Sequence, residues 1–286
     1  MVFATRIKKA DTLSRYILIN IALTMLRGLV KSVLTLTWTA FLLPVQIVAL
    51  KLSDPLATWI PRLYHRGAAL ILGLHVSIKG QPMREPRVLY VANHASWLDI
   101  VALGSILEAG FIAKSEVASW PGFGFLAKLQ QSIFIDRRRS QIRIGTDMVS
   151  KHLASGKRLV LFAEGTSNDG VRILPFQSSF FAVAAPGSSS ENVPVQPVSI
   201  SYTRRAGLPV VRNDLPGIAW YGDMSLLPHL WRLFCDGGRI EVTLHFHPQA
   251  DHQENQSRKA LARYCYNKVN EGVMESRRQM PSKAGS

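Results

Sequence analysis

Short apolar runs alternate with amphipathic stretches along the middle of the chain, and this pattern predicts its elements. The apolar runs are too short for helices and rich in β-forming residues, so we expect each of them to be a buried strand. They are residues 75–79, 88–91, 111–113, 132–136 and 159–162. The stretches that suit helices are residues 56–72, 100–107, 123–129 and 141–155. This alternation is typical of an α/β fold, with a mainly parallel or mixed central sheet flanked by helices.

The last third of the chain adds two strands and a closing helix. Residues 193–200 form an apolar run whose prolines favour an edge strand or a strand start. Residues 240–247 alternate as a second strand, and Ser257 is expected to cap the closing helix. The aromatic residues within 204–238 are interpreted as core rather than as a membrane-facing lid.

The N-terminal region is the most apolar part of the chain. Residues 1–12 are basic and polar and are expected to be irregular, whereas residues 32–50 contain no charge over nineteen residues, about the length that crosses a bilayer. Pro44 is expected to kink this stretch. Basic residues flank it on both sides, so a re-entrant or interfacial helix pair with both ends on the cytoplasmic face is favoured. A buried core helix is the alternative, and a cleaved signal peptide is not expected.

These patterns predict three parts. Residues 1–51 form a membrane-associated helical segment, residues 52–276 form the α/β domain, and residues 277–286 form a disordered basic tail.

Composition adds a constraint on the partner. The 286 residues are 47% hydrophobic and carry a formal net charge of +15, which implies an anionic partner: nucleic acid, a lipid surface or a phosphorylated substrate. The two cysteines, Cys235 and Cys265, lie far apart and argue against a disulfide scaffold or a zinc site. They fit a reducing compartment.

A candidate catalytic pair follows the strand at 88–91. His94 comes just after this strand, and Asp99 lies five residues further on. Neither a continuous helix nor a strand brings side chains with this spacing together. They meet if the chain turns at residues 95–97 and a helix begins there, with Ser96 as its N-cap. A neutral imidazole held by a carboxylate can then take a proton from an alcohol, although a polar strand end followed by a helix cap is the simpler alternative.

Other polar groups follow neighbouring strands, at the sheet edge where ligands bind. Lys114 and Arg137 each follow an apolar run, and an arginine there can clamp a phosphate, although a solvated basic face is the alternative. Gly165 lets backbone N–H groups approach an oxyanion, and Glu164 can bind substrate hydroxyls or support a cationic site, unless the two simply form a turn. Ser167 is not expected to be a nucleophile, because the second glycine of G-x-S-x-G is missing.

Four stretches together resemble the motifs of the glycerolipid acyltransferases, a family that includes lysophosphatidate and glycerol-phosphate acyltransferases. NHASWLD at residues 93–99 is similar to the first motif, FIDR at 134–137 to the second and FAEGT at 162–166 to the third. The apolar strand with a central proline at 193–200 resembles the fourth. The order of the motifs is also the family's order.

The resemblance implies a role for each matching residue. His94 is the base, Asp99 is its partner, Arg137 binds the phosphate of the acyl acceptor and Pro197 shapes the acyl pocket. The other expected substrate contacts are Lys114, Glu164, Gly165 and Thr166. Two departures stand out: Ala163 replaces the usual proline, and residues 167–169 (Ser-Asn-Asp) replace the frequent arginine after the threonine, which leaves the head group open.

The implied activity is transfer of a fatty acyl chain from an acyl carrier protein or coenzyme A thioester to the hydroxyl of a lysolipid. The principal expectation is 1-acylglycerol-3-phosphate as acceptor, giving phosphatidate. Residues 218–231 are similar to bacterial lyso-ornithine-lipid acyltransferases, so that acceptor is the alternative. The expected site is the cytoplasmic face of the inner membrane, against an anionic lipid surface. No bound cofactor or metal is expected, since His245 and His247 share a strand face without an evident third ligand.

Two other function classes compete with this interpretation. A non-enzymatic basic protein that binds nucleic acid or membrane explains the charge but not the motifs, and the chain lacks the consensus of common RNA modules, so no nucleic-acid partner is expected. A membrane esterase with the same base would release free fatty acid instead of a two-chain lipid.

Overall fold

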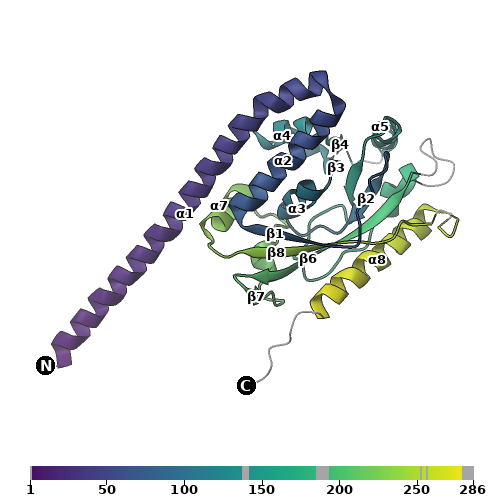
Figure 1. The fold of residues 1–286 in the computed structure, drawn as a ribbon. Helices are drawn as coiled ribbons and strands as arrows, with labels where there is room; N and C mark the ends of the chain where they lie inside the picture. Colours follow the sequence, from purple (N-terminus) through teal and green to yellow (C-terminus); the bar gives the residue numbers. More distant parts are fainter. Residues whose placement is uncertain (1, 137–141, 185–192, 252, 256, 279–286) are drawn as a thin grey trace.

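A single mixed sheet forms the centre of the fold (Figure 1). The computed structural model describes residues 2–136, 142–184, 193–251, 253–255 and 257–278. The sheet has the order β1-β8-β6-β2-β5-β3-β4, with β7 paired to β6. The strands are β1 Leu74–Lys79, β2 Leu89–Ala92, β3 Gly110–Lys114, β4 Ile133–Ile135, β5 Leu159–Phe162, β6 Val195–Arg205, β7 Leu208–Pro209 and β8 Ile240–Phe246. This architecture confirms the predicted α/β fold.

Strand direction brings the predicted polar segments to one edge. Strands β2, β3, β4, β5 and β6 are linked by parallel pairs, whereas β8 runs antiparallel to β6. The carboxyl ends of β2, β5 and β3 are therefore neighbours, and ligands bind at such an edge in α/β proteins.

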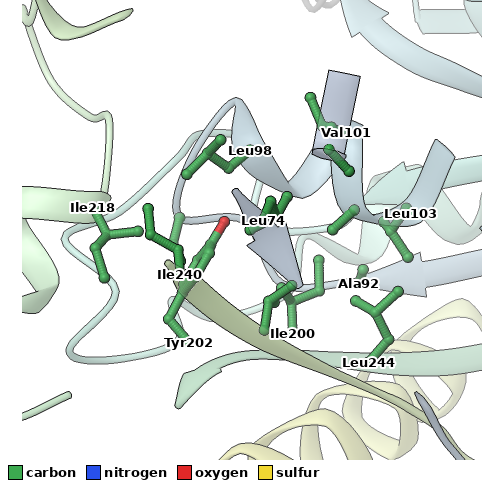
Figure 2. Close-up of a cluster of buried hydrophobic side chains, with 14 of the residues drawn as sticks. Leu74, Ala92, Leu98, Val101, Leu103, Ile200, Tyr202, Ile218, Ile240 and Leu244 are labelled. Atoms are coloured by element: carbon green, nitrogen blue, oxygen red, sulfur yellow. The ribbon is translucent and has the colours of Figure 1, made fainter. Parts of the chain in front are cut away.

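Helices cover both faces of the sheet (Figure 1). They are α1 Val2–Leu52, α2 Asp54–Leu72, α3 Leu98–Ile106, α4 Phe123–Leu129, α5 Ile142–Ala154, α6 Leu215–Ile218, α7 Leu226–Cys235 and α8 Arg258–Arg278. One core lies on the α2 and α3 face, where Leu98 and Val101 of α3 pack with Ile200 of β6 (Figure 2). A second core on the other face includes Val269 of α8. The predicted cap of α8 is confirmed, since Ala260 N donates to Ser257 Oγ at 3.1 Å.

Of the two alternatives for residues 193–200, the edge position is wrong and the strand start is confirmed, because β6 begins at Val195, between Pro194 and Pro197. Strand β6 lies inside the sheet, between β2 and β8. Pro197 is tolerated because its carbonyl accepts a bond from His247 N at 3.0 Å, just past the end of β8 at Phe246. Backbone N–H and C=O groups of one residue point to the same side of a strand, so the missing N–H of Pro197 faces the side where the β8 ladder has ended.

The N-terminal region is one continuous helix. Helix α1 begins at Val2 and runs through Pro44 to Leu52, so the described residues 2–52 contain neither the expected irregular segment nor a helix pair within the apolar stretch. The pairing occurs instead with α2, where Trp38 Nε1 donates to Tyr64 O at 3.1 Å and Gln46 Nε2 donates to Ala57 O at 2.9 Å.

Helix α1 leaves most of its apolar surface uncovered. Leu18, Leu29 and Leu36 are exposed, and the N-terminal half of α1 projects away from the α/β domain (Figure 1). Residues 15–52 are long and apolar enough to cross a membrane, and only 17% of their most apolar window is buried. The alternative of a buried core helix is therefore wrong.

Candidate active site

His94 and Asp99 meet at the carboxyl end of β2. The chain turns after His94, α3 begins at Leu98, and His94 Nδ1 lies 2.9 Å from Asp99 Oδ2. The predicted turn and contact are confirmed. Ser96 is not the N-cap, which is Trp97; its hydroxyl donates to Ile218 O at 2.9 Å.

The Asp99 carboxylate organises this turn from within the helix. Its Oδ2 atom also accepts bonds from Ala95 N at 2.7 Å and Ser96 N at 2.9 Å, while its Oδ1 atom accepts a bond from Tyr202 Oη at 2.6 Å. The side chain of Asp99 has 0% exposure. A buried carboxylate with four donors is stabilised as an anion in a fixed orientation.

The imidazole of His94 sits at the edge of the protein interior. Its side chain is 15% exposed, and its ring stacks on Phe162 with a centroid distance of 3.9 Å and an interplanar angle of 15°. Because Nδ1 is held by Asp99, Nε2 is the ring nitrogen that can take a proton. The arrangement is that of a general base.

Glu164 holds the His94 loop rather than facing an open site. It is 2% exposed and accepts bonds from His94 N and Leu174 N, each at 2.8 Å, and from the Asn168 side chain. Burial raises the pKa of Glu164 to about 7. The three hydrogen-bond donors lower this pKa, but their effect is smaller than that of burial. The carboxylate therefore positions backbone around His94, and its direct contact with substrate hydroxyls stays a prediction.

This raised pKa predicts a specific pH dependence of stability. A folded-state pKa of about 7 above the ordinary 4.5 means that the native protein binds the Glu164 proton more tightly than the unfolded chain. The contribution of Glu164 to the free energy of unfolding is full below pH 4.5. It is lost as the pH rises through about 7, and the total loss is up to about 3 kcal/mol. Chemical denaturation across this range should show the loss in the wild type and in the exposed control Thr166→Ala. Glu164→Ala should lack it, and an unchanged pH slope in that variant contradicts the assignment.

Gly165 and Thr166 complete the turn after β5. Gly165 has a φ of +78°, and an added Cβ would lie 2.7 Å from Gln177 Nε2, so glycine is required here. Its own N–H donates to Phe162 O at 3.1 Å, and an oxyanion role for backbone N–H groups near Gly165 stays a prediction. Thr166 is exposed at the surface of the turn.

The other predicted contacts are dispersed. Lys114 is exposed at the end of β3 and pairs with Glu116 at 3.1 Å. Arg137 lies outside the described residues, as do residues 279–286 of the predicted tail, whereas Arg277 and Arg278 still belong to α8. Pro197 lies two residues after Val195, so the two share one face of β6. That face belongs to the second core, on the opposite side of the sheet from Phe162.

Among the described residues, no metal site accompanies the pair. His247 Nε2 bonds to Ser199 Oγ at 2.6 Å, and the His245 and His247 rings lie 4.0 Å apart. Over the described part of the chain, no three His, Cys, Asp or Glu side chains are grouped so as to hold a metal ion.

Two contacts of the site were missed by the sequence patterns. Tyr202 reaches Asp99 from a strand 103 residues away, and Asn168 N donates to His94 O at 3.0 Å. Alternation along β6 predicts that Tyr202 shares a face with Ile200, but nothing in the sequence says where its hydroxyl points.

Comparisons with known proteins identify the class. Residues 74–201 match the family model described as Acyltransferase. A lyso-ornithine lipid O-acyltransferase from Rhizobium meliloti is 42% identical over 78% of this chain and 77% of its own length. A 1-acyl-sn-glycerol-3-phosphate acyltransferase from Neisseria gonorrhoeae is 31% identical over 68% of this chain and 72% of its own length.

The fold agrees with this class. The crystal structure of the 1-acyl-sn-glycerophosphate acyltransferase PlsC from Thermotoga maritima matches 93% of this chain and 99% of its own, with a TM-score of 0.62 and 22% identity. The protein is an acyltransferase enzyme. More narrowly, the chain belongs to the glycerolipid acyltransferase family, as the resemblance of its motifs implied.

Proposed function

We propose that this enzyme transfers a fatty acyl chain to the hydroxyl of a lyso-ornithine lipid. The observation that carries the proposal is the similarity to the Rhizobium meliloti lyso-ornithine lipid O-acyltransferase, which is 42% identical, against 31% for the relative named for 1-acyl-sn-glycerol-3-phosphate. This reverses the order of acceptors expected from the sequence. The lysophosphatidate acceptor remains the second candidate, because that relative also matches more than two thirds of the chain.

The turn after Thr166 supports an acceptor without phosphate. This chain has Ser167 at the position where the family frequently has an arginine. The next two residues, Asn168 and Asp169, stabilise the turn. Asn168 Oδ1 accepts a bond from Gly170 N at 2.6 Å, and Asp169 Oδ1 accepts one from Val171 N at 2.8 Å. Residues 167–169 therefore add no cation, which fits an ornithine head group.

The mechanism proposed for the pair is general base catalysis. His94 Nε2 removes the proton of the acceptor hydroxyl as its oxygen attacks the thioester carbonyl, and the Asp99 carboxylate stabilises the imidazolium that forms. The carbon–sulfur bond then breaks, and the proton passes from His94 to the leaving thiolate. The products are an ester and a free thiol, and no covalent enzyme intermediate is needed.

The donor proposed is an acyl thioester of acyl carrier protein or coenzyme A. Both are anionic, and a net charge of +15 favours their approach and that of an anionic lipid surface. Membrane association follows from the exposed apolar surface of α1. We place the enzyme on the cytoplasmic face, where both thioesters occur and where Cys235 and Cys265 stay free.

Membrane binding by α1 can be tested with charged substitutions. Leu29 and Leu36 are one heptad apart and are 57% and 70% exposed, so Leu29→Asp with Leu36→Asp should leave the α/β core intact. The affinity for liposomes, measured by co-sedimentation, should fall by about tenfold or more for each leucine replaced. The control is Leu208→Asp on β7, which is 71% exposed on another surface. Equal binding by the double variant, or equal loss in the control, contradicts the role of α1.

The identity of the acceptor is tested with a panel of two acceptors and two acyl donors. Full-length protein in liposomes is given lyso-ornithine lipid or 1-acylglycerol-3-phosphate, each with acyl carrier protein and coenzyme A thioesters. We expect the higher kcat/KM with lyso-ornithine lipid. A preference for the phosphate acceptor overturns the proposed head group while leaving the acyltransferase class intact.

A further inference from the structure

The Asp99 carboxylate is held from both sides. Oδ2 faces His94 and two backbone N–H groups, whereas Oδ1 has Tyr202 Oη at 2.6 Å. Asp99 is fully buried and Tyr202 is 5% exposed, so solvent does not compete for this contact. The series Tyr202, Asp99 and His94 therefore forms one continuous hydrogen-bonded chain that ends at the proposed base.

The local structure of β6 aims the tyrosine at this point. Strand β6 pairs with β2 only as far as Val198, and its later residues extend past the end of β2 at Ala92. The register with β8 shifts between Tyr202 and Arg204, and such irregularities near active sites re-aim side chains. Figure 2 shows the Tyr202 ring among buried apolar side chains, with its hydroxyl oxygen directed toward the helix that carries Leu98.

The direction of the proton in this contact is fixed by chemistry. An ionised carboxylate is only an acceptor, so the phenol must donate. Burial and the neighbouring Asp99 carboxylate raise the pKa of Tyr202 well above its ordinary value, so the hydroxyl keeps its proton. A donor on Oδ1 fixes the plane of the carboxylate, and this leaves Oδ2 pointing at Nδ1 of His94.

We propose that Tyr202 is a positioning residue for acyl transfer, which orients Asp99 and through it the base His94. The inference rests on the proposed function of the His94–Asp99 pair. The hydroxyl of Tyr202 bonds to Asp99, and the tyrosine is buried, so its effect should fall on the rate of the chemical step and not on substrate binding.

The first test is Tyr202→Phe, which removes one oxygen and keeps the ring. We expect kcat to fall by about ten- to hundredfold, as for loss of a hydrogen bond to a charged group, with KM for both substrates within about twofold. The control is Tyr90→Phe: Tyr90 is also buried and donates to Met83 O, away from the pair. Both variants should lose similar thermal stability, but only Tyr202→Phe should lose kcat. An unchanged kcat, or an equal loss in Tyr90→Phe, overturns the proposal.

The second test asks whether Tyr202 acts through Asp99. In an Asp99→Asn background the charge that Tyr202 orients is gone, so adding Tyr202→Phe should change the residual rate by less than about twofold. A merely structural tyrosine would give the same fold loss in both backgrounds, and that result overturns the proposal. If Tyr202→Phe does not fold, a 3,5-difluorotyrosine at position 202 keeps the hydroxyl and changes its donor strength. A change in kcat at constant KM then supports the role, and an unchanged kcat overturns it.

The outcomes separate the two proposals. Activity retained by His94→Ala removes the proposed base and the role of Tyr202 with it. Activity lost in His94→Ala but retained in Tyr202→Phe removes only the role of Tyr202.

Discussion

Replacing His94 by alanine is expected to lower kcat for acyl transfer by about 10²–10⁴-fold, the usual contribution of a general base. The imidazole is held by Asp99 on Nδ1 and stacked on Phe162, so Nε2 is aligned before substrate binds. Alanine removes the proton acceptor without removing the turn, because Asp99 still accepts the Ala95 and Ser96 N–H groups. Steady-state assays in liposomes measure the loss, and thermal unfolding checks the fold.

A matched histidine makes this prediction specific. His75 is exposed on β1, which is the edge strand of the sheet and is separated from β2 by β8 and β6. His75→Ala should therefore keep wild-type kcat. If folded His94→Ala retains kcat within about tenfold of the wild type, the base is another group.

Replacing Asp99 by asparagine is expected to lower kcat by about a hundredfold or more while preserving the fold. The asparagine carbonyl oxygen can accept the three N–H donors now bonded to Oδ2, and its amide can donate to Tyr202 Oη, which also accepts. The hydrogen bonds survive, but the charge that stabilises the imidazolium is lost. The loss should therefore appear in kcat rather than in the melting temperature.

The control for Asp99→Asn is another carboxylate that accepts a backbone N–H. Asp251 accepts a bond from Gln253 N at 2.7 Å on an exposed turn, and Asp251→Asn should leave kcat unchanged. A rate for Asp99→Asn close to that of the wild type would mean that the carboxylate only shapes the turn.

Hydrophobic patterning predicted the sheet because its strands are short, apolar and followed by polar turns. Strand β5 at Leu159–Phe162 and helix α4 at Phe123–Leu129 coincide with their predicted ranges. For β6 the strand-start alternative was correct and the edge alternative was not. Pro197 lies near the start of β6, and the N–H that it lacks faces a position that β8 no longer occupies. Helix α1 continues past Pro44, which agrees with the long apolar stretch predicted around this proline.

The pair His94 and Asp99 was predictable because it follows a strand, a turn and a helix start can join it, and NHASWLD resembles the first family motif. Tyr202 was not predictable, because its contact depends on the register of two distant strands. Glu164 illustrates a third case: the turn was predicted, but the direction of the carboxylate depends on donors from His94, Asn168 and Leu174, which meet only in the folded chain.

The most direct measurement follows the acyl group itself. Full-length protein in liposomes is given a deuterated acyl thioester of acyl carrier protein and lyso-ornithine lipid, and the lipids are analysed by mass spectrometry beside a His94→Ala sample. Transfer of the deuterated chain to the lysolipid hydroxyl by the wild type, with His94→Ala nearly inactive, is the predicted result. Release of the chain as free fatty acid, or equal transfer by His94→Ala, would contradict it.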